Sequence, residues 1–436
     1  MMSRVKRGST VLAVGCALAL PALLSAAADR AAVEAAAAAV EEQVIVWRRD
    51  IHQNPELGNR EFRTAALVAK HLRELGFDSV TTDVAHTGVV GLLKGGRPGP
   101  VVALRADMDA LPVKERVDVP FASQAMGEYN GQEVPVMHAC GHDNHVAILM
   151  GAAQVLAGMR DDLAGTVKFI FQPAEEGPPA GEEGGAKMMI AEGVLADPAP
   201  EAIFGLHVGP MTTGSLNYRP RGALAAADGL SILVEGAQTH GSSPWMGVDP
   251  VIVAGQIIAA LQVIPSRQLD ITTAPAVVSI GSIHGGVRGN IIPDKVEMTG
   301  TIRTFDTSMQ EDFHARIKRT AESIGEAAGA KVTVTIDPYA PVTYNDPELT
   351  ARMLPTLEWA AGADAVNEVP RIMGAEDFAF FQEQIPGFYF FLGVNKEGVG
   401  LGQAASNHSP YFFANEDALI VGVRALAGMV TDYLGD

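Results

Sequence analysis

Cysteine is scarce in this chain: its 436 residues include only Cys16 and Cys140. Cys16 lies in an N-terminal segment that we expect to be removed, which leaves one thiol and excludes an intramolecular disulfide. Exported proteins usually keep their cysteines in disulfides. A lone thiol in an oxidising compartment is easier to understand if a metal ion binds it as the thiolate.

Positive charge is also scarce. The chain has 32 Lys and Arg against 51 Asp and Glu, and its formal net charge is −19. This excess repels nucleic-acid phosphates and argues against a nucleic-acid partner. A hydrophobic content of 47% and a charged content of 19% are typical of a globular protein. The length fits one large domain or two ordinary ones.

Long apolar runs are absent except near the N-terminus, where Val11–Leu24 follows a short basic segment. This run contains a proline and is too short for a membrane span. With Ala26-Ala27-Ala28 as the cleavage site, residues 1–28 have the pattern of a secretory signal peptide. We therefore expect a mature N-terminus at Asp29, a periplasmic or secreted protein, and no membrane association after cleavage. Lipoprotein processing at Cys16 is disfavoured because the usual preceding leucine is missing.

Beyond the N-terminus, helical and strand-like apolar patterns alternate. Residues 29–43 are alanine-rich, and we expect a frayed helix or a tether there, without a site. Parallel strands are joined by helical crossovers, so the alternation predicts a mainly parallel sheet with covered faces. The expected helices are 44–52, 60–75, 142–159 and 186–192, and the expected strands are 88–93, 101–104, 166–171 and 202–207.

The rhythm changes after residue 222. The next expected elements are strand 229–234, helix 250–263, strands 276–282 and 295–304, helix 309–327 and strand 331–336. This β-α-β-β-α-β order matches the ferredoxin-like motif. From residue 346 the α/β pattern returns. The sequence thus predicts an α/β catalytic domain in two parts, 44–222 and 341–436, interrupted by a smaller α+β domain over 223–340.

Two short motifs carry residues suited to metal chemistry. One is His138-Ala-Cys140-Gly-His142-Asp-Asn-His145, and the other is the pair Glu175-Glu176 after an expected strand. Thiolate, imidazole and carboxylate groups form a ligand set for a zinc-like ion. One of two adjacent glutamates can hold metal while the other moves protons. The plainer alternative is a polar helix start with a small buried cysteine, but the crowding of potential ligands favours a metal site.

Five potential site residues follow the ends of expected strands: Asp107, Asp109, Glu175, Glu176 and His207. Ligands in parallel sheets bind at the carboxyl ends of the strands. If the sheet is parallel, these scattered residues therefore converge at one edge. We expect a hydrolase-like metal site there.

The chain resembles the bacterial metal-dependent amidohydrolases of the aminoacylase, hippurate hydrolase and auxin-conjugate hydrolase family. The resemblance runs from about Ile45 to the C-terminus and rests on a fixed order of motifs around an inserted domain. These are Arg105-Ala-Asp-Met-Asp-Ala-Leu-Pro112, His138-Ala-Cys-Gly-His-Asp143, Gln172-Pro-Ala-Glu-Glu176, Leu206-His207, Gly374-Ala-Glu-Asp-Phe378 and His408-Ser-Pro410. Any one motif alone would be weak evidence, but their order is specific.

The resemblance implies a zinc-exopeptidase-like catalytic domain with two divalent metal ions per subunit. The implied ligands are Cys140, His142, Glu176, His207 and His408, and the implied general base is Glu175. Zinc, manganese, cobalt and nickel all remain open as the native metal, because affinity order does not decide occupancy in cells.

Several neighbours of these residues have less defined roles. Asp109 resembles an aspartate that steadies a metal ligand. Asp107 stands where peptidase relatives carry a metal-ligating histidine, so its role is open between a site residue and a hydrogen-bonded carboxylate at a strand end. For His138 and His145 a structural role is favoured, because the two metals already have their ligands.

In the inserted domain, the segment Gln238–Trp245 resembles a lid motif whose histidine, here His240, stabilises the developing oxyanion. Relatives often have histidine where this chain has Trp245. Asn290 and Arg303 resemble positions that bind a substrate carboxylate, for which an arginine fork is well suited. An exposed strand arginine is the alternative for Arg303. The resemblance also implies a lid and dimerisation role for this domain, with a homodimer that delivers His240 from the neighbouring subunit.

The leading hypothesis is hydrolysis of the amide bond of an N-acyl or N-aroyl amino acid to a carboxylic acid and a free amino acid. A metallo-exopeptidase or dipeptidase on the same scaffold is the alternative within enzymes. A non-catalytic exported binding protein would be expected to have lost Glu175 or several ligands, and this sequence retains all of them.

Overall fold

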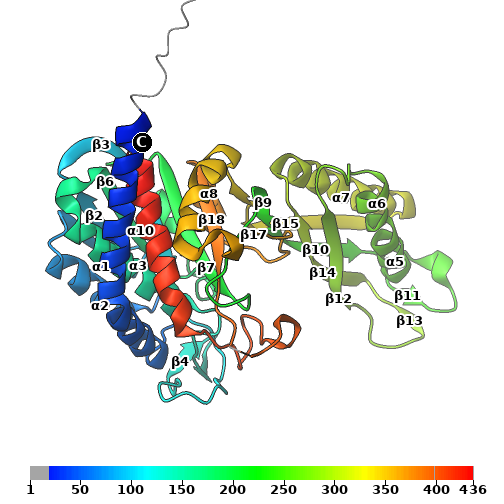
Figure 1. The fold of residues 1–436 in the computed structure, drawn as a ribbon. Coiled ribbons are helices and arrows are strands. Elements are labelled where there is room, and N and C mark those ends of the chain that lie inside the picture. Colours follow the sequence, from blue (N-terminus) through cyan, green and yellow to red (C-terminus); the bar gives the residue numbers. More distant parts are fainter. Residues whose placement is uncertain (1–18, 397, 436) are drawn as a thin grey trace, which may run out of the picture.

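The computed structural model describes residues 19–396 and 398–435, so the first 18 residues of the expected signal peptide lie outside the described residues. The chain forms a large α/β unit and a smaller α+β unit beside it (Figure 1). The large unit contains both chain ends of the described part, and the smaller unit is built from its middle.

An eight-stranded sheet forms the centre of the large unit in the described part of the chain. Its four inner strands β6, β3, β7 and β18 run parallel, and the pairs β1–β2, β2–β6 and β18–β8 are antiparallel. The mainly parallel sheet predicted from the sequence is therefore confirmed. In spatial order the strands are β1 (Ser79–Val84), β2 (Gly88–Lys94), β6 (Ala164–Gln172), β3 (Arg97–Asp107), β7 (Ala202–Gly209), β18 (Gly387–Gly393), β8 (Leu216–Tyr218) and β17 (Val366–Glu368).

Helices cover both faces of this sheet. On β3, Val102 and Leu104 point into a core shared with the long helices, whereas Ala103 between them packs in a second core on the opposite face. This alternation is the period of a strand buried on both sides. The first core contains α1 (Ala19–Gln53), α2 (Phe62–Glu74), α3 (His142–Gly158), α8 (Pro347–Ala361) and α10 (Leu419–Gly435), and the second contains α4 (Gly185–Ala191) and α9 (Ala379–Gln382).

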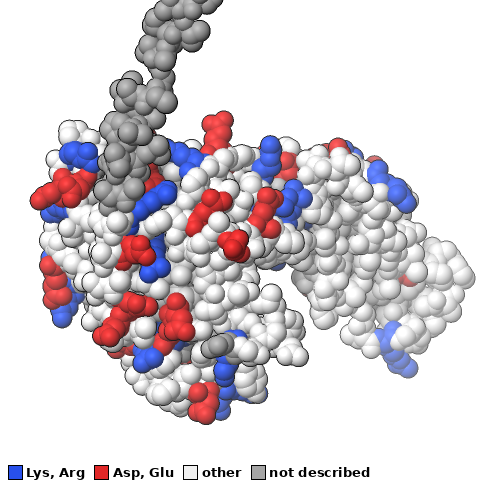
Figure 2. Space-filling view, in the orientation of Figure 1, with Lys and Arg blue, Asp and Glu red and all other residues white. Residues whose placement is uncertain are grey.

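The smaller unit is an antiparallel sheet in the order β12-β14-β10-β15, with helices packed against it. Its chain order is β-α-β-β-α-β, so the predicted ferredoxin-like arrangement is confirmed. In Figure 2 the visible face of this unit carries few charged side chains, whereas charges are scattered over the large unit. The elements are β10 (Ala226–Glu235), α5 (Pro250–Leu261), α6 (Val263–Arg267), β12 (Ala276–His284), β14 (Lys295–Thr304), α7 (Thr307–Ala328) and β15 (Lys331–Ala340).

Short strand pairs complete the described chain. The two connections between the units pair as β9 (Arg221–Leu224) with β16 (Thr343–Asn345). At the far end of the smaller unit, β11 (Thr239–His240) pairs with β13 (Ile291–Ile292). The hairpin β4 (Met126–Tyr129) and β5 (Gln132–Pro135) was not predicted, because its short strands carry no apolar alternation.

The expectation of a frayed helix or tether over residues 29–43 is wrong. These residues belong to α1, which packs against α3 and α10. Val33, Ala37, Val40 and Val44 are each at most 2% exposed and form one stripe at helical spacing. The many alanines between them concealed the stripe, because alanine occurs readily on both the buried and the exposed face of a helix.

The buried stripe of α1 leads to a stability prediction. Val40→Ala should lower the free energy of unfolding by about 1–3 kcal/mol, because it removes buried methyl groups and leaves a cavity. Val46→Ala is the matched control, since Val46 lies on the same helix and is 56% exposed. Its cost should stay below about 0.5 kcal/mol. The free energy of unfolding of both variants is measured by urea denaturation. If Val40→Ala and Val46→Ala are equally stable, the packing of α1 is contradicted.

Candidate metal centre

Three parallel strands end at the same edge of the large sheet and bring the predicted site residues together. Asp107 is the last residue of β3 and is paired in register with Gln172, the last residue of β6. His207 lies near the end of β7, on the other side of β3. Glu175 and Glu176 follow the end of β6 after two residues, so both carboxylates come to this edge.

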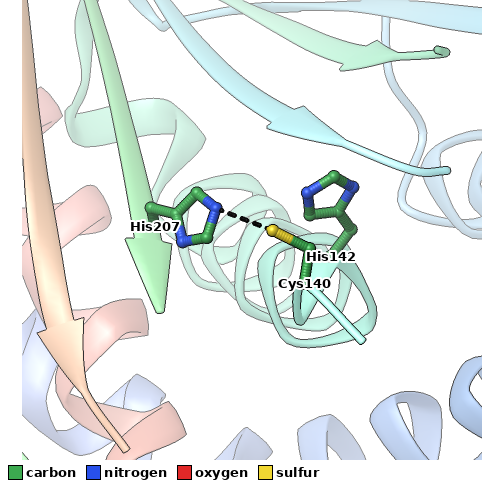
Figure 3. A group of neighbouring side chains, drawn as sticks. All are labelled: Cys140, His142 and His207. Atoms are coloured by element: carbon green, nitrogen blue, oxygen red, sulfur yellow. Dashed lines mark hydrogen bonds between the residues drawn. The ribbon is translucent and has the colours of Figure 1, made fainter. Parts of the chain in front are cut away.

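Cys140 lies at the centre of the cluster, and Figure 3 shows its thiol pointing toward His207. Its Sγ is 3.3 Å from His207 Nε2 and 3.3 Å from His408 Nε2. His408 Nε2 is in turn 3.0 Å from a carboxylate oxygen of Glu176. The turn that presents the thiol requires Gly141, whose φ is +100°, because a Cβ there would lie 2.4 Å from Val208 Cγ2.

Two histidines are held with Nε2 directed into the cluster. His207 Nδ1 donates to the Val208 carbonyl at 2.7 Å, so Nε2 carries the free lone pair of the neutral ring. Burial and the neighbouring His145 hold the pKa of His207 well below its usual value, which keeps the ring neutral. His142 Nδ1 is 3.2 Å from Asp109 Oδ1, and its buried Nε2 has no hydrogen-bond partner among the described residues.

Asp109 connects a histidine to the glutamate pair. One of its oxygens accepts from the Glu175 amide and the other from the Glu176 amide, each at 3.0 Å. The same carboxylate contacts His142 Nδ1. A single side chain therefore fixes the backbone of two neighbouring glutamates relative to an imidazole, as expected of a residue that steadies metal ligands.

Asp107 lies behind the cluster, in contact with Arg105 and His145. Its oxygens are 2.6 Å from Arg105 Nη1 and 2.5 Å from His145 Nδ1. His145 Nε2 accepts from the Val208 amide at 2.9 Å. Both ring nitrogens of His145 are thus used within the protein, which leaves this histidine no lone pair for a metal and fits the favoured structural role. His138 is buried, and neither ring nitrogen has a hydrogen-bond partner among the described residues.

Buried carboxylates crowd this edge without enough positive charge to balance them. Burial, reinforced by Glu376, Glu176 and Asp377, raises the pKa of Glu175 well above its usual value. For His142, burial opposes the charge, yet Asp107, Asp109 and Glu176 together raise its pKa to about 10. The cluster therefore attracts positive charge. Divalent cations fit this donor set of thiol, imidazoles and carboxylates, and they would also use the unpartnered His142 Nε2.

A buried arginine network behind the cluster was not singled out from the sequence. The Arg105 guanidinium is fully buried and donates to Gln172, Asp107, Glu376 and Asp377 at 2.6–3.0 Å. The signal was present in the motifs that begin at Arg105, Gln172 and Gly374. It was missed because separate motifs do not reveal which charges share a buried site.

The predicted residues of the inserted domain do not join the cluster within one chain. His240 is exposed on β11, at the end of the smaller unit away from the large sheet (Figure 1). Asn290 lies beside it, because the Gly241 amide donates to the Asn290 carbonyl at 2.8 Å. Arg303 lies near the opposite end of β14, in register with Ala227 at the start of β10.

Comparison with known proteins identifies the family. A family model described as peptidase family M20/M25/M40 matches residues 103–432. The chain belongs to this family. Thermostable carboxypeptidase 2 of Saccharolobus solfataricus is 41% identical over 89% of this chain and 94% of its own length. N-acetylcysteine deacetylase of Bacillus subtilis is 36% identical over 90% and 97%, and IAA-amino acid hydrolase ILR1-like 2 of Arabidopsis thaliana is 38% identical over 89% and 84%.

Solved structures agree with this membership. A protein from methicillin-resistant Staphylococcus aureus superimposes with a TM-score of 0.84, at 34% identity, over 93% of this chain and all of its own. The Bacillus subtilis protein YXEP, described as a dinuclear metal-binding peptidase of the family, gives a TM-score of 0.75 at 34% identity over 91% and 99%. The chain is thus a metal-dependent amidohydrolase that uses two divalent metal ions, and the cluster contains groups of side chains that could hold them.

Removing the central thiol tests the ligand assignment. Cys140→Ala should fold but lose most of its bound metal, because a central donor of the cluster is gone. Ser123→Ala is the control, since Ser123 is buried and its hydroxyl donates to the Val136 carbonyl and accepts from the Ala125 amide, outside the cluster. Metal content per chain is measured by plasma mass spectrometry after dialysis. Wild-type metal content in Cys140→Ala would remove Cys140 from the ligand set.

Proposed function

We propose that this protein hydrolyses the amide bond of N-acyl or N-aroyl amino acids, releasing a carboxylic acid and a free amino acid. The observation that carries the proposal is the position of Glu175. Its Oε2 lies 3.8 Å from the unpartnered His142 Nε2, next to Glu176, and its side chain lines a cavity of about 520 Å³. Relatives named as an N-acetylcysteine deacetylase and an IAA-amino acid hydrolase support an N-acyl amino acid as the substrate.

The proposed ligands are Cys140, His142, Glu176, His207 and His408. When bound, two divalent ions polarise an amide carbonyl and lower the pKa of a water molecule. Glu175 then accepts the proton of the attacking water and passes it to the amide nitrogen as the C–N bond breaks.

Glu175 is predicted to be the general base. Glu175→Gln should lower kcat by roughly 10²–10⁴-fold, because the glutamine side chain cannot accept a proton from the attacking water. The metal content should stay at the wild-type value. Glu182→Gln is a matched control, since Glu182 lies on the rim of the same cavity and pairs with Arg60. Near-normal turnover in Glu175→Gln would contradict the assignment.

A carboxypeptidase activity is the second candidate, because the two Saccharolobus solfataricus relatives at 40–41% identity carry that name. Both activities cleave an amide whose nitrogen belongs to an amino acid with a free carboxylate, and they differ in the acyl half. N-acetyl, N-benzoyl and indoleacetyl amino acids compared with dipeptides and longer peptides distinguish them. Higher kcat/KM for peptides would favour the carboxypeptidase.

For the substrate carboxylate we propose Asn290 and Arg303, which lie near opposite ends of β14 and would therefore come from different chains, and for the oxyanion we propose His240. Because His240 and Asn290 lie at the far end of the smaller unit, they must reach a metal cluster by domain closure or from a second subunit. We propose a homodimer through the inserted domain. Val251, Ile252 and Val263 on α5 and α6 support it, since these apolar side chains are 44–60% exposed.

By length and composition alone, 250–267 could span a membrane, as could the mostly buried stretch 416–435. The first of these stretches contains the exposed residues of α5 and α6. Both stretches also contribute to the cores of folded units, which argues against a membrane span. We therefore assign the exposed apolar surface of α5 and α6 to the proposed subunit interface.

Complementation tests the delivery of His240 from the partner. His240→Ala should lower kcat by ~10²–10³-fold without loss of metal, because an oxyanion donor is removed. Mixed with Glu175→Gln, it should recover about a quarter of wild-type activity, since half of the dimers are mixed and each has one intact site of two. Tagged pull-down verifies subunit exchange. Exchange without recovery would show that His240 does not act across the dimer.

We also propose that the protein is exported after cleavage between Ala28 and Asp29. Such a cut would leave the buried stripe of α1 intact, because the stripe begins at Val33. It would also retain Arg30, which pairs with Asp432 of α10 at 2.7 Å. Mass spectrometry of exported material should give an N-terminus at Asp29. An intact Met1 or a lipid on Cys16 would contradict the proposal.

A further inference from the structure

The residues that line the cavity beside Glu175 suit one half of an amide substrate better than the other. It measures about 520 Å³ and lies between α4, the start of α9 and the end of β15. This volume falls within the usual range of small-molecule sites. Glu175 lines one wall, so a group bound here lies next to the proposed general base.

The charges around the cavity disfavour a carboxylate. Its lining contains five acidic residues and one cation among the described residues, Lys187 on α4. Two of the acids are already balanced: Asp377 accepts from Arg105 and Gln172, and Glu182 pairs with Arg60 at 2.5 Å. The remaining acids are Glu175, Glu183 and Asp337, which leave the lining net negative. An amino acid carboxylate would be repelled here.

The rest of the lining is apolar. Met188 and Ala191 project from α4, Phe380 lies in α9, and Pro338 and Tyr339 come from the end of β15. Methionine adapts its shape to a bound apolar group, and aromatic rings add contact area. The inserted domain thus supplies one wall of the cavity. Gly177 allows this close approach, because a Cβ there would lie 3.3 Å from the Tyr339 hydroxyl.

We propose that this cavity binds the acyl half of the substrate and selects uncharged acyl groups that are bulky and apolar, either aromatic or medium-chain aliphatic. The inference rests on the proposed function, in which the amide lies across the metal cluster. The amino acid half carries the carboxylate, so it lies on the other side of the scissile bond. The acyl half is then the part of the substrate beside Met188, Ala191 and Phe380.

Filling the cavity tests this assignment. Met188→Trp and Ala191→Phe should each lower kcat/KM for N-benzoyl and N-octanoyl amino acids by ~10–100-fold, because the acyl group loses its space. Hydrolysis of the N-acetyl amino acid, whose acyl group is small, should stay within about threefold. The control is Met126→Trp, since Met126 is 55% exposed on β4 and lies outside the cavity. N-succinyl amino acids, with a carboxylate on the acyl group, should be the poorest substrates of the wild-type enzyme.

Binding is measured independently of turnover, with benzamide as the probe and saturation-transfer NMR on the metal-loaded protein. Benzamide should bind to wild type and Met126→Trp but not to Met188→Trp. If wild type binds benzamide in this way yet hydrolyses no N-acyl amino acid, the proposed function fails while the apolar cavity stands. If the folded filling variants bind benzamide normally, or lose acetyl and benzoyl hydrolysis equally, the acyl assignment is overturned. Preference for dipeptides would instead assign the cavity to a cationic aminoacyl group.

Discussion

Crowding of buried carboxylates at the carboxyl edge of the large sheet is the constraint on which the rest of the site depends. Asp107, Asp109, Glu175 and Glu376 are buried at this edge, and the Glu176 side chain is 15% exposed. Oxygens of Asp107, Glu175 and Glu376 lie within 4.8 Å of one another, and like charges this close are costly in a low-dielectric interior. Arg105 balances the inner part of the group by donating to three carboxylates, those of Asp107, Glu376 and Asp377. The outer part, around Cys140 and His142, is balanced when divalent cations bind.

The inner and outer carboxylates also differ in their roles. The inner carboxylates bond to Arg105, His145 and Tyr389, so they hold the strand ends together. Near Cys140 and His142, two carboxylates hold three consecutive backbone amides after β6. Glu61 accepts from the Ala174 amide, and Asp109 accepts from the amides of Glu175 and Glu176. The backbone of the proposed base Glu175 and of the proposed ligand Glu176 is therefore held next to His142.

The sequence was sufficient for much of this arrangement. Strand–helix alternation predicted the parallel sheet, and the parallel sheet predicted that residues after β3, β6 and β7 would meet. The sequence did not predict contacts between residues that are far apart in the chain. The four bonds of Arg105 join three motifs separated by up to 272 positions, and no local pattern encodes them. Likewise, the stripe of valines and alanine in residues 29–43 could not show that α1 would pack against α3 and α10, because these helices lie far away in the sequence.

The position of bound metal tests the account most directly. Crystals of the metal-loaded protein, measured with anomalous scattering at the absorption edge of the bound metal, locate each ion without reference to activity. The account predicts two peaks per chain, both within the group formed by Cys140, His142, Glu176, His207 and His408. A single peak, or an ion bound between Asp107 and His145, would contradict it.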